Sequence, residues 1–338
     1  MTAAPGQGLR ATVAARPVLV ARPVVVALSA FCAFVLGACS AGSGGPSGAP
    51  AASSPPATHA ASKASATTSP SASPTPTVAH LSPPAVPGVT WRAAGTVVNG
   101  VTATYIASTA GGSVGLLWID PSVVSFRLIP GFRVPEGGPA TAADNTPSTW
   151  VPRMVAAFNG GFLLKDGVGG YYADHRMVRP LVSNLAAFEI TADGRLAVGA
   201  WGRDLQLTSK TVVVRQNLRL LVDHGRSQTS TSDGPRTWGI ANGGLWTANR
   251  SALGQLADGS LVFAYGHETR AATMAAALVQ VGAQRAIALD MNKSWPGGFV
   301  YRHTAGAIVG QRVHPLQYHS PSVYYTRYTK DFVAVLRR

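Results

Sequence analysis

The sequence is poor in cysteine and has no long apolar segment. Its 2 cysteines, Cys32 and Cys39, both lie near the N-terminus, so the remaining chain has no thiol. This excludes the disulfide-stapled class of small secreted domains. The apolar run at 24–35, interrupted only by Ser29, is shorter than the ~20 residues that a membrane-spanning helix needs. We therefore do not expect a permanent transmembrane helix.

Other absences narrow the chemistry. The histidines after the N-terminal region show no metal-ligand spacing, and no dinucleotide fingerprint precedes an expected helix. We therefore expect no metal and no cofactor.

Acidic residues are few, with 14 Asp+Glu against 28 Lys+Arg and a formal net charge of +14. A positive surface attracts anions, so a phosphorylated glycan or an anionic wall polymer is the expected partner. A generally basic proteome is the alternative explanation of this charge. No Lys/Arg block with interleaved aromatics occurs, so nucleic acid is not an expected partner.

The N-terminus contains the parts of an export signal. Three arginines precede the apolar run, and the run ends in Leu36-Gly37-Ala38-Cys39. This order is typical of a secretory signal peptide, and its last four residues resemble the bacterial lipobox, in which the cysteine is acylated. We expect residues 1–38 to be a lipoprotein signal peptide. Cys39 would then carry lipid, such as palmitate, and hold the protein at the cell surface on the outer face of the cytoplasmic membrane. An ordinary cleavage site beside an incidental cysteine is the alternative.

The segment after Cys39 is almost entirely Ala, Ser, Thr, Pro and Gly. Such a composition buries too little apolar surface to offset chain entropy. We expect a disordered stalk at 39–87, followed by one folded domain at 88–338, which is long enough for a substantial core.

Strand signals dominate the expected domain. Short β-type runs bounded by Gly, Pro or Asp-Gly turns occur at 102–106, 114–119, 123–129, 185–190, 196–198, 211–214, 218–222, 246–253, 261–265 and 286–290. One helix is expected at 269–281, with Thr269 as its cap and Gly282 after its end. The sequence thus predicts an α+β fold, a strand-rich mixed sheet with few helices.

Two glycine-containing motifs are candidates for a binding site. Asn159, Gly160 and Gly161 follow an apolar strand, and their glycines would let a ligand approach backbone N–H groups. A plain turn is the alternative. Tyr172 and Asp174 lie in a glycine-hinged loop that suits a sugar, with a surface hairpin as the alternative.

Polar side chains at strand ends supply further candidates. Arg236 and Arg250 each precede a hydroxyl residue, and arginine matches phosphate oxygens in bidentate fashion. A solvated arginine is the alternative. Asp290 ends a buried strand and is followed by the polar residues Asn292, Lys293 and Ser294.

Taken in order, these motifs resemble the phosphodiester glycosidase family, named for N-acetylglucosamine-1-phosphodiester alpha-N-acetylglucosaminidase. The family pattern has N-G-G-F, here 159–162, then R-[ST]-A-x-G, here 250–254. Next come D-G, here 258–259, and L-G-A, which reads V-G-A here at 281–283. The last motif, L-D-G-G-G-S, reads L-D-M-N-K-S at 289–294, so the glycine triplet is replaced.

The resemblance implies hydrolysis of a sugar-1-phosphodiester to free sugar and a phosphomonoester. Asp290 would be the acid/base or orienting carboxylate, Arg250 would neutralise the phosphodiester, and Asn159 would bond the sugar or the reacting oxygen. Ser294 would bond phosphate, and Lys293 would replace glycine N–H groups as an anion partner.

Two alternatives stay open. Loss of the glycine triplet favours a non-catalytic glycan- or wall-polymer-binding lipoprotein on the same fold. A plain glycosidase is the other. The sequence does not reveal the oligomeric state.

Overall fold

Antiparallel strands are the main regular structure of the described residues. The computed structural model describes residues 79–132, 146–239, 245–326 and 328–338. Every pairing between its named strands is antiparallel. The predicted strand-rich α+β class is confirmed. The predicted signal peptide, Cys39 and most of the predicted stalk lie outside the described residues.

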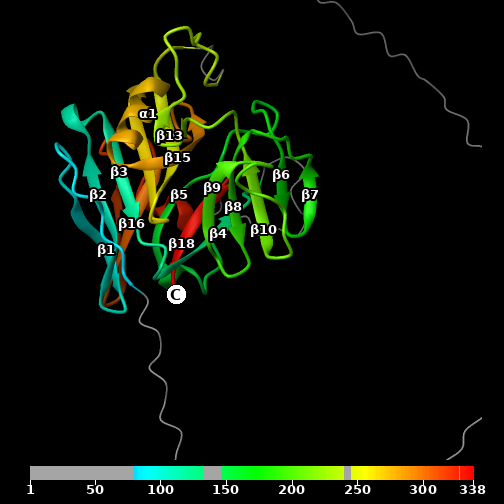
Figure 1. The fold of residues 1–338 in the computed structure, drawn as a ribbon. Helices are drawn as coiled ribbons and strands as arrows, with labels where there is room; N and C mark the ends of the chain where they lie inside the picture. The colour runs from blue at the N-terminus through cyan, green and yellow to red at the C-terminus, as the bar shows by residue number, and fades with distance from the viewer. Residues whose placement is uncertain (1–78, 133–145, 240–244, 327) are drawn as a thin grey trace, which may run out of the picture. The chain divides into compact units, whose positions relative to one another are not determined.

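The largest sheet has eight strands, seen in Figure 1 around the labels β3, β13 and β15. In spatial order they are β1 (Arg92–Val98), β2 (Val101–Ser108), β3 (Val114–Ile119), β14 (Leu261–Thr269), β13 (Ala248–Leu256), β15 (Ala283–Met291), β11 (Val222–Asp223) and β12 (Arg226–Ser227).

Two five-stranded sheets complete the fold. One contains, in spatial order, β7 (Arg176–Arg179), β6 (Tyr171–Ala173), β10 (Thr211–Gln216), β8 (Ala186–Thr191) and β9 (Leu196–Ala200). The other contains β17 (Ala307–Arg312), β16 (Gly298–Thr304), β5 (Met154–Asn159), β18 (Phe332–Arg337) and β4 (Val124–Ile129). Short 3-10 turns lie at Ala110–Gly112, Val151–Arg153 and Pro321–Tyr325.

One hydrophobic core joins the three sheets. It includes Phe263 from β14, Phe158 from β5 and Phe188 from β8, all fully buried. The rings of Phe158 and Phe263 stack with centroids 5.2 Å apart. Each buried phenylalanine stabilises the fold by roughly 1.5–3 kcal/mol. Gly298 must be glycine, because a Cβ there would lie 2.3 Å from the ring of Phe263.

The opposite face of the eight-stranded sheet is covered by α1 (Ala271–Gln280), the one α-helix among the described residues. Its Met274 and Leu278 are buried against that sheet. The helix was predicted to start at Thr269, but that residue ends β14 and Arg270 occupies the cap position without a side-chain cap hydrogen bond. Gly282 follows the helix with φ +89°, as predicted for a terminating glycine.

The remaining predicted strands agree with the structure except for 218–222. There, only Val222 belongs to a strand, and Leu218 adopts φ +47°. The preceding Asn217 donates hydrogen bonds to the carbonyls of Ala288 and Leu289, at 2.7 and 3.1 Å. A left-handed residue cannot continue an extended strand, so this correction follows from backbone geometry.

Residues just before the predicted domain start at 88 also contact the domain. The Leu81 N–H donates to Asp120 Oδ2 at 3.2 Å, and Trp91 Nε1 donates to the Pro84 carbonyl at 3.0 Å. Gln280 of α1 donates to the Pro87 carbonyl at 3.1 Å. Residues 81–87 are thus tied to the domain. No helix in the described ranges is long and apolar enough to cross a membrane.

Candidate active site

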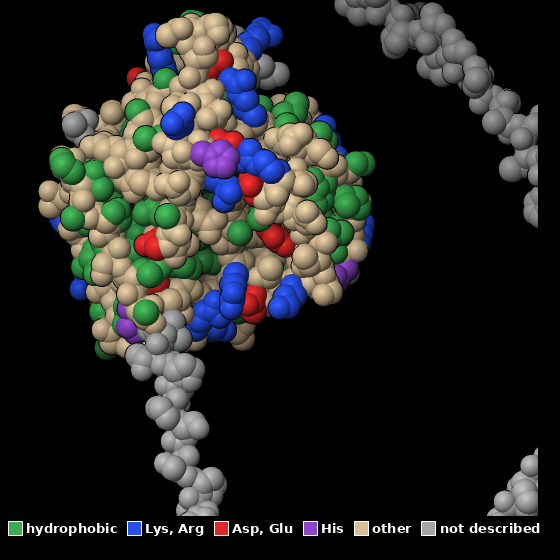
Figure 2. All heavy atoms as spheres, in the orientation of Figure 1, with side chains coloured by type: hydrophobic (Ala, Val, Ile, Leu, Met, Phe, Trp, Pro, Cys, Tyr) green, Lys and Arg blue, Asp and Glu red, His purple; other side chains and the backbone are tan. Residues whose placement is uncertain are grey.

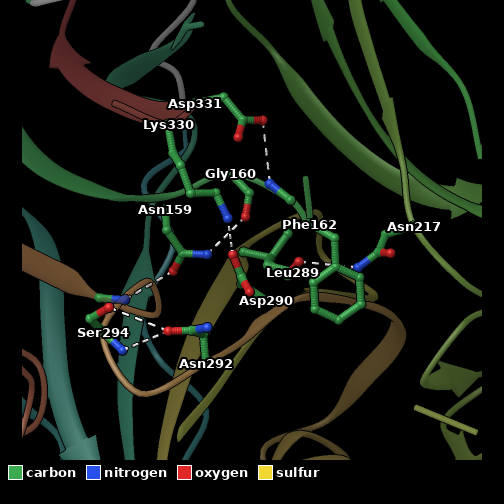
Figure 3. A network of polar contacts seen from close by, with 12 residues as sticks. Asn159, Gly160, Phe162, Asn217, Leu289, Asp290, Asn292, Ser294, Lys330 and Asp331 are labelled. Atoms are coloured by element: carbon green, nitrogen blue, oxygen red, sulfur yellow. Dashed lines mark hydrogen bonds and ion pairs between the residues drawn. The ribbon is translucent and has the colours of Figure 1, made fainter. Parts of the chain in front are cut away.

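Asp290 lies on β15 opposite Ser251 of β13, where the two strands meet with an irregular register. Only 4% of Asp290 is exposed. Its Oδ2 accepts a hydrogen bond from the ammonium of Lys330, which is equally buried (Figure 3). Burial raises the pKa of Asp290, and the charge of Lys330 opposes that effect. A carboxyl with a raised pKa can hold or accept a proton nearer to neutral pH, as acid/base chemistry requires.

Lys330 comes from the C-terminal part of the chain, two residues before the start of β18. Its ammonium also lies 5.2 Å from the centroid of the Trp295 ring. Lys330 was not a predicted site residue, because it is 40 positions from Asp290 and belongs to none of the motifs. No local signal announces such a pairing, which the order of strands in the sheet creates.

Asn159 ends β5 and ties two loops together. Its Oδ1 accepts a hydrogen bond from Gly297 N–H at 3.0 Å, and its Nδ2 donates to the Gly160 carbonyl at 2.8 Å. Both ends of the amide are thus engaged by backbone, and the residue is only 2% exposed. In this structure Asn159 fixes the backbone beside Asp290 and Lys330 (Figure 3).

Gly160 and Gly161 are glycines because an internal ion pair approaches them. A Cβ on Gly160 would lie 2.3 Å from Asp331 Oδ2, and one on Gly161 would lie 3.1 Å from the Arg215 guanidinium carbon. Their N–H groups already donate to the Asp331 carbonyl and to Asp331 Oδ2, at 2.8 and 3.3 Å. Neither glycine has a positive φ. The sequence predicted that a ligand would approach the N–H groups of these glycines, but in the structure Asp331 occupies that position.

Arg215 and Asp331 form a second buried ion pair next to the first. Arg215 Nε donates to Asp331 Oδ2 at 2.9 Å, with side-chain exposures of 3% and 1%. The guanidinium also donates to the Phe162 carbonyl and lies over the Tyr171 ring at 5.5 Å. The charge of Asp331 contributes to raising the pKa of Asp290. Sequence reasoning missed both partners, since an isolated arginine inside a strand gives no pairing signal.

The residues that replace the glycine triplet form a turn. Asn292 Oδ1 accepts hydrogen bonds from the N–H and hydroxyl of Ser294, at 3.0 and 3.3 Å. Lys293 is exposed, and its carbonyl accepts a hydrogen bond from Asn249 at 2.9 Å. Met291 is buried with Phe162 and Ala248. The Met291 side chain therefore fills an apolar cluster.

Arg250 lies on β13 opposite Met291, one residue before Ser251. The register between β13 and β15 shifts just after Ser251, so the simple alternation of strand faces does not apply here. Arg250 and Asp290 border one narrow void of about 10 Å³ together with Phe162 and Trp238. Arg250 donates to the carbonyls of Thr269 and Trp238, at 3.1 and 2.9 Å.

On its outer side Arg250 also lines a larger cavity of about 390 Å³. The cavity lies between the start of α1 and the segment that follows β12, which stands above α1 in Figure 1. Its walls include Trp238, Trp246, Arg270 and Asp233. None of these residues was a predicted site residue, since they lie outside the motifs or in a loop with no periodicity.

The structure separates the other predicted residues from this centre. Tyr172 is buried in a small apolar cluster of the β6-containing sheet. Asp174 and His175 have φ values of +49° and +60° and form the exposed turn between β6 and β7, so the hairpin alternative describes this loop. Arg236 is exposed in the loop beyond β12 and does not line the cavity.

Basic side chains are prominent on the surface. Figure 2 shows Lys and Arg around the upper lobe and along the lower edge, with fewer acidic groups. Within the described part of the chain, no group of three or more His, Cys, Asp or Glu is placed to hold a metal ion.

Comparison with known proteins agrees with the expected family. Residues 152–290 match the family model for phosphodiester glycosidase, and that stretch ends at Asp290. No curated protein sequence matches the chain.

The solved structures that this chain resembles are distant from it. The catalytic domain of zebrafish N-acetylglucosamine-1-phosphodiester alpha-N-acetylglucosaminidase, auto-inhibited by its pro-peptide, has 18% identity and a TM-score of 0.42. That alignment covers 74% of this chain and 81% of the zebrafish chain. A protein from Synechocystis has 14% identity and a TM-score of 0.37, over 74% of this chain and 62% of the other.

Proposed function

We propose that this phosphodiester glycosidase domain hydrolyses sugar-1-phosphodiester linkages in envelope glycans or wall polymers. The observation that carries the proposal is Asp290, a buried carboxylate with a raised pKa at the end of the family-matched stretch. It borders the same void as Arg250, a cation suited to a phosphodiester. The two groups are the minimum that this reaction needs, a proton carrier and a charge partner.

In the proposed reaction, water adds to the anomeric carbon as the bond from that carbon to the phosphate oxygen breaks. Asp290 accepts the proton of the attacking water, and the released phosphomonoester carries the bonding electrons. Lys330 keeps the carboxylate oriented and balances its charge. The buried hydroxyl of Ser251, which has no hydrogen-bond partner among the described residues, is available to a substrate oxygen.

A non-catalytic glycan-binding role is the second candidate. The observation in its favour is the turn at 292–294, where Asn292 and Ser294 bond to each other and Lys293 is exposed. Side chains occupy the positions where the family has glycines, so backbone N–H groups are less accessible to phosphate. Such a protein would bind the polymer and release no sugar.

Sugar release separates the two candidates. The mature protein is incubated with a synthetic sugar-1-phosphodiester and, in parallel, with an aryl glycoside of the same sugar. We expect free sugar from the phosphodiester only, and none from the Asp290→Asn variant. The Asp290→Asn/Lys330→Met double variant serves as a second inactive form without an unpaired buried ammonium. Binding of the phosphodiester with no turnover would establish the binding role instead, and cleavage of the aryl glycoside would indicate a plain glycosidase.

The cell-surface location belongs to the same proposal. Acylation of Cys39 with two or more chains would anchor the protein firmly, at about 0.8 kcal/mol per buried CH₂. We expect Cys39→Ser to be released from membranes, while the parent chain stays with them after a high-salt wash. A cleaved Cys39→Ser chain that still sediments with membranes would contradict the anchor.

A further inference from the structure

The cavity beside Arg250 has an unusual charge arrangement. Arg250 is 6% exposed, and no carboxylate of the described chain lies within ion-pair distance of it. Two of its nitrogens donate to backbone carbonyls, which are neutral acceptors. Burial lowers the pKa of Arg250 to about 10, with no acidic neighbour to offset the loss of solvent. A buried cation without a counter-charge is expensive, and an anionic ligand would remove that cost.

A second source of positive potential lines the same cavity. The first residues of α1, Ala271 and Ala272, form part of the wall, and the helix has no acidic residue in its first turn. Its N-terminal N–H groups receive no side-chain cap. Uncapped N–H groups and the helix dipole together favour an anion at this end. Arg270 adds an exposed guanidinium at the rim.

The acid in the cavity wall is already neutralised. Asp233 forms an ion pair with Arg219 at 3.1 Å and accepts a hydrogen bond from Trp238 Nε1 at 2.7 Å. It also accepts the Ser230 N–H at 2.8 Å. Its charge is therefore engaged inside the wall, and the cavity keeps a net positive lining.

The rest of the lining suits a sugar. Trp246 is 48% exposed, with the Arg270 guanidinium 5.4 Å from its ring centroid. Thr229, Ser230 and Thr231 add hydroxyl groups, which both donate and accept hydrogen bonds. The aromatic ring can stack on the apolar face of a pyranose ring, and the hydroxyl groups and cations can bind its hydroxyls and phosphate.

We propose that this cavity binds a phosphorylated sugar, with the phosphate held by Arg250, Arg270 and the start of α1 and the sugar ring against Trp246. The inference rests on the proposed function only in taking a glycosyl phosphate as the ligand class. It adds residues outside the family motifs and predicts binding that is measurable without turnover.

The test is calorimetric titration of the full mature protein with three probes: glucose 1-phosphate, inorganic phosphate and methyl glucoside. We expect glucose 1-phosphate to bind most tightly and methyl glucoside to bind least. Arg270→Ala should weaken both phosphates by about ten- to a hundred-fold, the effect of losing a charge-assisted contact. Trp246→Ala should weaken glucose 1-phosphate and leave inorganic phosphate unchanged.

Arg302→Ala is the matched control, since Arg302 is an exposed arginine on β16 and is not part of the cavity. It should bind all three probes as the parent does. Arg270 and Trp246 are themselves exposed, so their variants should keep the parental melting temperature. Equal losses in Arg270→Ala and Arg302→Ala would overturn the site, as would methyl glucoside binding as tightly as glucose 1-phosphate. Equal affinity for the two phosphates, unaffected by Trp246→Ala, would overturn the sugar contact.

The proposed binding site and the proposed hydrolysis can be refuted independently of each other. A protein that binds glucose 1-phosphate through Arg270 and releases no sugar from phosphodiesters refutes the proposed reaction and keeps this site. A protein that hydrolyses phosphodiesters equally well with Arg270→Ala, and whose binding is unchanged, refutes the site and keeps the reaction.

Discussion

Asp290 and Lys330 lie side by side with only 3% of each side chain exposed. Two charges removed from water are tolerable only as a pair, because each one alone keeps its full desolvation cost. We expect Asp290→Asn to destabilise the fold by about 3–5 kcal/mol, since it leaves the Lys330 ammonium buried and unpaired. Urea unfolding of parent and variant measures the difference.

The double variant Asp290→Asn/Lys330→Met is the control for that prediction. Removing both charges should recover most of the lost stability, and the coupling between the two sites should appear as non-additivity. If the stability losses of Asp290→Asn and Lys330→Met added up to that of the double variant, the carboxylate and the ammonium would not depend on each other.

His314 makes stability depend on pH. Its Nε2 donates to the Gly112 carbonyl at 3.0 Å, and its Nδ1 accepts the Leu316 N–H at 3.2 Å, so the neutral ring satisfies both contacts. Burial lowers the pKa of His314 below its ordinary value of 6.5, and His267 at 6.0 Å between ring centroids adds to the effect. The unfolded chain therefore binds the proton more readily, and stability is present above pH 6.5 and declines as pH falls through the lowered folded pKa.

The measurement is the urea midpoint at several values between about pH 7 and pH 5. His314→Gln, which cannot titrate, should show a smaller decline than the parent. Part of the decline should persist, because burial also lowers the pKa of His319. An identical decline in parent and variant would contradict the assignment.

At the scale of elements, the end of β5 depends on two glycines that face an ion pair. Gly160→Ala would place a methyl 2.3 Å from the Asp331 carboxylate, which is held by Arg215 and cannot swing away freely. We expect a loss of about 1–3 kcal/mol from this overpacking, read as a lower melting temperature.

Gly297→Ala is the matched comparison for Gly160→Ala. Gly297 also contacts Asn159 through its N–H, but a Cβ there would meet its nearest atoms at an ordinary 3.6 Å. Its melting temperature should stay close to that of the parent. An equal drop in the two variants would mean that glycine flexibility, and not the Asp331 contact, matters at position 160.

At the scale of the whole molecule, residues just before the composition boundary of 88 are bound to the domain. Leu81 and Pro84 are hydrogen-bonded to it, and Val86 packs against the apolar cluster beneath α1. We expect limited proteolysis to remove the stalk and to leave a core that retains Leu81, identified by mass spectrometry. Early cuts inside β13, β14 or β15 would contradict a single cooperative domain.

Local patterns were enough for much of the fold. The hairpin around Gly194, the turn at Gly259 and the helix ended by Gly282 follow from φ preferences and periodicity, and the structure confirms each of them. Asp290 at the end of a buried strand was also readable from sequence. The prediction of a strand at 218–222 was wrong, because Leu218 has a left-handed backbone conformation. The neighbouring Asn217 is held there by its hydrogen bond to the Ala288 carbonyl.

The sequence by itself determined the strand-rich class, the resemblance of residues 152–290 to phosphodiester glycosidases and the presence of Asp290 and Arg250, because these depend on local propensity and motif order. Only the tertiary structure decided which groups meet Asp290. Lys330 reaches it because β18 is placed beside β5, and Asp331 reaches Gly160 and Arg215 by the same placement. The cavity at α1 likewise joins residues from a loop, β13 and the helix start. Such contacts arise from the hydrophobic packing of three sheets around one core, and that packing is non-local.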